Sequence, residues 1–301
     1  MIRLGTGGAF GLDQNYDKNE FYRLLAEAGY ASCDFYLMIP SEDPYWKRPD
    51  DQLKEQMLAE RAVMDANGII PGQAHGPIIS SDPNDPSTKE PRWNSVIQAI
   101  KACSYLGCPY LVVHPIMLPQ RLHKEGVEET KALNMEFFNY LRPALKEYGV
   151  KCAIENIYWY DHDLGRTCET TCSSPEELID YLDTLNADGN ELYVACFDIG
   201  HCVLAYQDPI RMIHALGYKY LHCTHIHDNN YINDNHLAIG MGKINWPEVG
   251  RAFREIGFDK VFNFEDGTTY HFFRGKINQR QLALDMLRLS SAMGNAIVNC
   301  Q

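Results

Sequence analysis

The most informative part of the chain is Leu192-Tyr193-Val194-Ala195-Cys196-Phe197-Asp198-Ile199-Gly200-His201, an apolar run of strand length that ends in an aspartate and a histidine. A short apolar run of this kind is typical of a strand buried on both faces of a parallel sheet. A segment with helical periodicity follows it, and the same unit recurs on either side along the chain. This recurrence predicts an α/β fold.

Eight such apolar runs predict strands over residues 2–7, 31–38, 69–74, 110–113, 150–154, 192–197, 220–226 and 260–264. Helical spacing and helix-end signals predict helices over residues 18–28, 51–66, 93–106, 128–148, 175–185, 209–216, 247–256 and 278–293. Eight strands that are each followed by a helix predict a single (β/α)8 TIM-barrel domain over residues 1–301. The segment 158–174 is predicted as a loop after the fifth strand. An open doubly wound sheet is the rival fold, but Gly5-Thr6-Gly7-Gly8 does not match its usual G-x-G-x-x-G turn.

Composition argues against several classes of protein. The 301 residues carry a formal net charge of −13 and 45% hydrophobic residues, which excludes intrinsic disorder and counts against a nucleic-acid partner. No apolar run is long enough to span a membrane, and the first residues do not read as a signal peptide. Ten cysteines without a C-x-x-C pair favour reduced thiols and a cytoplasmic location. A homo-oligomer is compatible with the sequence.

Ionisable residues stand where six consecutive predicted strands end: His75, His114, Glu155, Asp198, His225 and Glu265. The carboxyl ends of barrel strands meet at one rim, and burying such groups costs free energy unless they are paired or bound to a metal. The pattern therefore favours a divalent cation held by carboxylates and imidazoles. Taken singly, each histidine is also compatible with a hydrogen-bonded rim residue, and each glutamate with a salt bridge to a distant arginine.

At these residues the sequence resembles the xylose-isomerase-like TIM-barrel superfamily, which includes sugar isomerases, sugar epimerases and endonuclease IV. The motifs that carry the resemblance are Glu155-Asn156, Asp198-Ile199-Gly200-His201, His225-Ile226-His227-Asp228, Gly240-Met241-Gly242-Lys243-Ile244-Asn245-Trp246 and Phe264-Glu265. They occur in the family's order, each at its expected strand, and the resemblance covers nearly the whole chain.

The resemblance implies a metal-dependent sugar isomerase or epimerase of carbohydrate metabolism, which removes a proton beside a carbonyl through an enediolate. It implies one divalent ion (Mn, Zn, Co or Mg) held by Glu155, Asp198, His225 and Glu265, with the two glutamates as the acid/base pair. His225 is preferred to His227 because the family has an acidic residue three positions after the ligand, where this chain has Asp228.

Five further residues, His75, His114, His201, Asp234 and His236, are implied substrate-binding groups or additional metal ligands. With the first four residues they match the types of the nine ligands that hold three zinc ions in endonuclease IV, so a trinuclear phosphodiesterase is the alternative. Four ligands with one divalent cation leave a formal −1, which suits a neutral polyol, whereas nine with three cations leave +2, which suits a phosphodiester.

The same enediolate chemistry would also serve a dehydratase, and a non-catalytic sugar- or metal-binding barrel is a third alternative. Ketose 3-epimerases carry an arginine shortly after the strand-seven histidine, where this chain has Tyr231, and this counts against a free ketose. The expected partner is a small sugar, and Trp46 and Lys243 are weaker candidates for contacts with it.

Overall fold

Eight parallel strands form one sheet in the order β10-β1-β2-β3-β4-β5-β8-β9 in the computed structural model. The structure describes residues 1–7, 17–37, 47–79, 89–118, 126–266 and 279–299. The strands are β1 (Arg3–Gly7), β2 (Ser32–Tyr36), β3 (Ile70–His75), β4 (Tyr110–Val113), β5 (Lys151–Glu155), β8 (Tyr193–Asp198), β9 (Leu221–His225) and β10 (Val261–Phe264). All eight lie within two residues of their predicted bounds.

The sheet closes on itself between its first and last strands. Ile226 pairs with Phe264 in a parallel bridge, its amide donates to the carbonyl of Asn263 at 2.8 Å, and the amide of Glu265 donates to the carbonyl of Ile226 at 2.9 Å. These bonds confirm the predicted TIM barrel and exclude the open doubly wound sheet. They also fix the backbone beside His225 and Glu265, because the closure occurs at the residues next to them.

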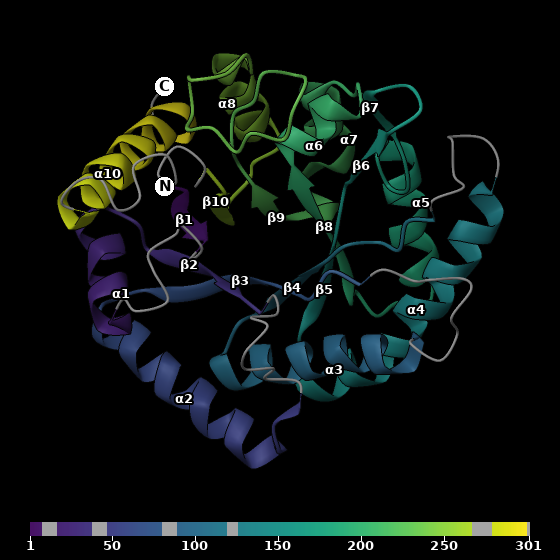
Figure 1. Cartoon of the computed structure of the whole chain (residues 1–301), viewed down its shortest axis with the longest axis horizontal. Helices are drawn as coiled ribbons and strands as arrows, with labels where there is room; N and C mark the ends of the chain where they lie inside the picture. Colours follow the sequence, from purple (N-terminus) through teal and green to yellow (C-terminus); the bar gives the residue numbers. More distant parts are fainter. Residues whose placement is uncertain (8–16, 38–46, 80–88, 119–125, 267–278, 300–301) are drawn as a thin grey trace.

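Helices surround the strands (Figure 1). They are α1 (Lys18–Glu27), α2 (Asp50–Ala66), α3 (Lys89–Leu106), α4 (Val127–Tyr148), α5 (Pro175–Leu185), α6 (Ile199–Leu204), α7 (Pro209–Tyr220), α8 (Trp246–Glu255) and α10 (Gln279–Val298). The two ends of the described chain meet, since the amide of Ile2 donates to Oδ1 of Asn299 at 2.7 Å.

Two elements differ from the sequence-based prediction. The segment predicted as a loop over residues 158–174 contains an antiparallel hairpin of β6 (Tyr158–Asp161) and β7 (Arg166–Glu169). Its turn is stabilised by Oδ1 of Asp161, which accepts from the amides of Asp163 and Leu164, and by Gly165 at a φ of 63°. The short helix α6, directly after β8, was also missed. Both are local structures whose length is below what apolar periodicity reveals.

Apolar side chains fill the space between the strands and helices, and Phe138, Phe197 and Phe262 are fully buried there. Some interior positions of the barrel are instead polar, among them Asp34 and Gln73, which are 1% and 2% exposed. The nine described cysteines are all free. Among the described residues, no helix combines the length and apolar character needed to cross a membrane.

Candidate functional site

Four residues predicted as metal ligands meet at the carboxyl end of the barrel. Glu155, Asp198 and His225 are the last residues of β5, β8 and β9, and Glu265 follows β10. Nδ1 of His225 lies 3.0 Å from a Glu155 oxygen, 3.4 Å from a Glu265 oxygen and 3.9 Å from an Asp198 oxygen. Three carboxylates from separate strands thus surround one imidazole nitrogen.

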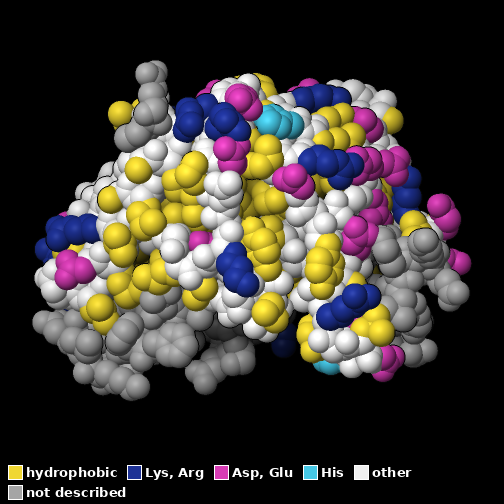
Figure 2. Space-filling view, turned by 90° about the horizontal axis from the view of Figure 1, so that it is seen from above, with side chains coloured by type: hydrophobic (Ala, Val, Ile, Leu, Met, Phe, Trp, Pro, Cys, Tyr) yellow, Lys and Arg dark blue, Asp and Glu magenta, His cyan; other side chains and the backbone are white. Residues whose placement is uncertain are grey.

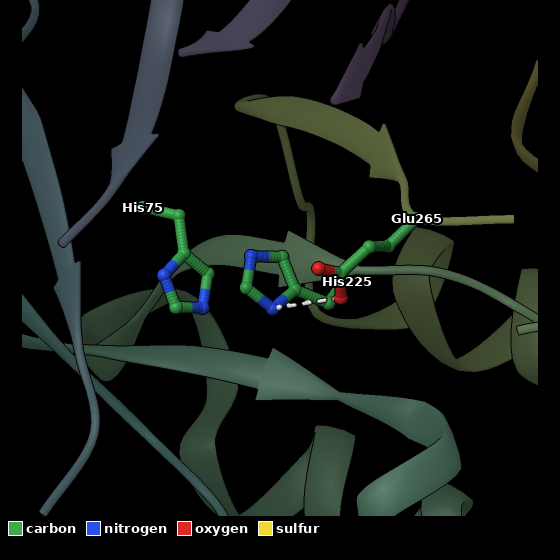
Figure 3. Close-up of side chains that lie close together, drawn as sticks. All are labelled: His75, His225 and Glu265. Atoms are coloured by element: carbon green, nitrogen blue, oxygen red, sulfur yellow. Dashed lines mark ion pairs between the residues drawn. The ribbon is translucent and has the colours of Figure 1, made fainter. Parts of the chain in front are cut away.

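Two more histidines complete this cluster. Nε2 of His114 lies 3.0 Å from Oε2 of Glu155, and Nε2 of His75 lies 3.7 Å from the same oxygen. The ring of His75 stacks on that of His225 with centroids 5.5 Å apart, and Glu265 lies on the far side of His225 (Figure 3). Two sets, His75-His225-Glu265 and His75-His114-Glu155, have ligand atoms close enough together to hold one cation.

The remaining predicted site residues form an adjoining group around Asp234. Oδ2 of Asp234 lies 3.3 Å from Nε2 of His201 and 3.2 Å from Nε2 of His236. His201 connects the two groups, because its Nδ1 is also 3.3 Å from Oε1 of Glu155. His236 has a φ of 46°, a left-handed conformation that is uncommon for residues other than glycine.

All nine predicted imidazole and carboxylate residues therefore gather at one place, whereas Lys243, one of the two weaker candidates, does not join them. Lys243 is exposed and does not line the pocket formed by the described residues. Trp46 lies outside the described residues.

Several residues of the site escaped the sequence analysis. The hydroxyl of Tyr36 donates to Oε1 of Glu265 at 2.9 Å. His227, considered from the sequence but not chosen as a ligand, has its Nε2 3.2 Å from Oδ1 of Asp198. Asp34, on β2, lies behind His225. A signal for Asp34 was present, because an aspartate inside a predicted buried strand requires a partner.

Positively and negatively charged groups alternate across the site. Burial opposes the charged form of His225, yet the surrounding acidic groups, including Glu265 and Glu155, raise its pKa well above 6.5. For Glu155, burial acts to raise the pKa, but His225 and His114 hold it well below its ordinary value. The pKa of His236 rises to about 9, against the effect of burial, mainly through Asp234. Protons on these imidazoles thus balance the clustered carboxylates.

The donor set fits a divalent cation. Oδ1 of Asp234 is buried yet accepts no hydrogen bond among the described residues. A buried carboxylate oxygen without a donor is costly unless a cation or another group satisfies it. Mixed imidazole and carboxylate ligands suit zinc, manganese and cobalt.

A pocket of about 210 Å³ opens over these residues. It is lined by Tyr36, His75, Ile78, His114, Glu155, His201, Asp234, His236 and Glu265. The volume lies below the roughly 300–1,000 Å³ of pockets for drug-sized ligands, and eight of the nine lining residues carry a polar or ionisable group. As the described residues form it, this pocket suits a small polar molecule.

Comparisons with known proteins agree with this architecture. Residues 22–299 match the family model described as xylose isomerase-like TIM barrel. The uncharacterized protein MJ1311 of Methanocaldococcus jannaschii is 33% identical over 171 residues, which are 56% of this chain and 54% of that protein. The chain thus matches about half the length of this curated relative.

Two solved structures share the fold over nearly their whole length. D-psicose 3-epimerase of Clostridium cellulolyticum H10, solved with D-tagatose, superposes with a TM-score of 0.73 at 16% identity and covers 99% of both chains. The IolI protein, solved with a zinc atom, superposes with a TM-score of 0.70 at 16% identity and covers 98% of both chains.

Proposed function

This chain belongs to the xylose isomerase-like TIM barrel family, and on that premise we propose that it is a divalent-metal-dependent isomerase or epimerase of a sugar or sugar derivative. The observation that carries the proposal is the position of Nδ1 of His225 within 3.9 Å of three carboxylates from three strands. A sugar epimerase and a zinc-binding protein among its structural neighbours support it. We take residues 1–301 as one barrel domain in the cytoplasm.

In this proposal Glu155, Asp198, His225 and Glu265 hold the cation. When bound, a divalent ion would polarise a sugar carbonyl and stabilise the negative charge of an enediolate. His75 and His114 face the same pocket from β3 and β4, where their ring nitrogens can orient sugar hydroxyls. His201 reaches the pocket from α6 and is the proposed contact to a substrate oxygen.

The proton is transferred by Glu155 and Glu265. They follow β5 and β10, which are separated by three steps around the ring of eight strands, so their carboxylates reach a small substrate from different sides. The side chain of Glu265 is 16% exposed, whereas that of Glu155 is 1% exposed. Glu265 also accepts a hydrogen bond from the hydroxyl of Tyr36. Returning the proton to the opposite face of the same carbon gives epimerisation, and returning it to the neighbouring carbon gives isomerisation.

The substrate we propose is a sugar or sugar derivative other than a free ketose. Tyr231, at the position where ketose 3-epimerases carry an arginine, offers no positive charge. Its hydroxyl donates instead to the backbone carbonyl of Lys243 at 3.2 Å. Loss of a β-hydroxyl from the same enediolate would make the enzyme a dehydratase, which differs in product but not in the first step.

A phosphodiesterase with three metal ions is the second candidate. It is favoured by the multiple ligand groups, since Glu155-Asp198-His201 and His227-His236-Glu265 also have ligand atoms close enough to share a cation. Nucleic-acid binding would require several contacts to phosphates. On the face shown in Figure 2, however, lysines and arginines are interspersed with acidic side chains, and the chain carries a formal −13.

Two measurements test the proposed function. Metal analysis of the purified protein should find one divalent ion per chain, whereas three zinc ions would favour the phosphodiesterase. Incubation with a panel of sugars in deuterated water should place deuterium beside a carbonyl. Glu265→Gln should abolish this exchange, whereas Glu60→Gln, a buried carboxylate bound to Tyr22 away from the site, should retain it. A protein that binds metal but never exchanges deuterium would be a binding barrel and not an enolising enzyme.

A further inference from the structure

We infer that Asp34 is a positioning residue that orients His225 toward the cation, an inference that rests on the proposed function. Oδ2 of Asp34 lies 3.3 Å from Nε2 of His225, on the side of the ring opposite to Nδ1. Both side chains are buried, at 2% and 0% exposure. Among the described residues, His225 is the one imidazole or cationic side chain that forms an ion pair with Asp34.

Two amides hold the carboxylate of Asp34 in place. Nε2 of Gln73 donates to Oδ2 at 2.8 Å, and Nδ2 of Asn263 donates to the same oxygen at 3.0 Å. Gln73, on β3, also reaches β9. There its Oε1 accepts a hydrogen bond of 3.4 Å from the amide of Thr224, the residue before His225. Gln73 and Asn263 together form a clamp, and this clamp fixes Asp34 relative to the strand that carries His225.

The fold provides this arrangement through an irregularity between β2 and β3. Cys33 is paired with Pro71, but Asp34 is paired with Gln73, so Gly72 is the extra residue. An extra residue in one strand changes the direction in which the side chains beside it point. Here it places Asp34 and Gln73 side by side in the interior. A Cβ atom at position 72 would lie 2.2 Å from Oγ of Ser32 and 3.1 Å from Cγ2 of Val261, so a larger residue there would require these side chains to move.

The consequence for His225 is a choice of tautomer. A neutral imidazole has one N–H and one lone pair, and the partner of one nitrogen decides where the proton resides. Once a cation displaces the proton on Nδ1, a carboxylate at Nε2 keeps the remaining proton there, and the lone pair of Nδ1 would face the cation among Glu155, Asp198 and Glu265. A metal-binding histidine commonly donates its other N–H to a carboxylate, and removing such a partner typically weakens metal binding by about 10- to 100-fold.

The test is metal affinity, measured by titrating metal-free protein with Co²⁺ against a coloured chelator, together with the visible spectrum of bound Co²⁺. Asp34→Asn keeps the side-chain size but can offer an N–H to Nε2, which favours the wrong tautomer. We expect its dissociation constant for Co²⁺ to rise by about 10- to 100-fold and its spectrum to change. Gln73→Met leaves Asp34 in place without one of its two donors and should weaken binding by a smaller factor. Glu60→Gln should leave affinity and spectrum unchanged.

The outcomes separate this inference from the proposed function. Wild-type protein that binds Co²⁺, with Asp34→Asn equal to it in affinity and spectrum, would overturn the role of Asp34 and leave the proposed function standing. If the wild-type protein binds no divalent metal, both fall. Should Asp34→Asn fail to fold, Gln73→Met decides, because unchanged affinity in that variant would contradict the clamp.

Discussion

His227 occupies the space that a side chain at Gly200 would need. A Cβ atom at position 200 would lie 1.9 Å from Cε1 of His227 and 2.5 Å from its Nε2. The ring of His227 is completely buried, stacks on His236 with centroids 4.1 Å apart, and contacts Asp198 through Nε2. The glycine of the Asp198-Ile199-Gly200-His201 motif thus leaves room for the ring of His227, which follows the next strand, β9.

Gly200→Ala should therefore destabilise the protein by about 1–3 kcal/mol, the usual cost of forcing a methyl group into a packed interior. Urea unfolding of the metal-free protein measures this change. Combining it with His227→Ala, which empties the space, should cost less than the sum of the single changes. Additive effects in this double-mutant cycle would show that the two residues do not compete for space.

Tyr36→Phe tests the hydroxyl that donates to Glu265. A hydrogen bond to a charged group contributes about 1.5–3 kcal/mol, so its loss should slow deuterium exchange into the substrate by about 10- to 100-fold. Tyr110→Phe is a matched control, because its hydroxyl contacts His222 at the opposite end of the barrel. Equal exchange rates in the two variants would argue against a role for Tyr36 in proton transfer.

Asp228→Ala should unfold the loop that carries Asp234 and His236. The buried carboxylate of Asp228 accepts from the amides of Gly240 and Ile244 and from the indole of Trp246 at 2.9–3.1 Å. Each buried donor left without an acceptor costs about 1–3 kcal/mol. We expect a lower urea midpoint and faster proteolysis within residues 229–245. Asp259→Ala, an exposed aspartate, should leave both measurements at wild-type values.

Metal binding should release protons and strengthen as the pH rises. In the metal-free site the pKa of His225 is well above 6.5 and that of His236 is about 9, so both imidazoles are protonated at neutral pH. A cation held by Nδ1 of His225 can bind only after displacing the proton on that nitrogen, whereas His236 is not among the four proposed ligands. The affinity should therefore increase from pH 6.5 toward pH 9. Calorimetry in buffers of different ionisation enthalpy counts the protons, and a pH-independent affinity without proton release would contradict this charge pattern.

Much of the site could be predicted from the ends of the strands. Glu155, Asp198, His225 and Glu265 each follow an apolar run, and parallel strands of a barrel bring such positions to one rim. The ends of the strands did not show which of His225 and His227 faces the carboxylates. The sequence offers both His225 and His227 on one face of a strand, and only the folded chain shows that Nδ1 of His225 faces three carboxylates while His227 lies against Asp198 and stacks on His236.

The missed residues had weaker signals for a physical reason. The hairpin of β6 and β7 has strands of four residues, too short for a clear period, and its turn depends on one aspartate side chain. Tyr36 and Asp34 lie on β2, which pairs with β1 and β3, so nothing nearby in the chain relates them to His225 or Glu265.

Apolar periodicity and the residues that interrupt it were sufficient to determine a closed α/β barrel with ionisable groups at one rim, because both features are local properties of each strand and its end. The tertiary structure alone decided which atoms of those groups face one another, and that Asp34 lies behind His225. Those contacts join residues up to 229 positions apart, such as Tyr36 and Glu265. They depend on strand register, on the bulge at Gly72 and on barrel closure at Ile226, and no local pattern encodes these.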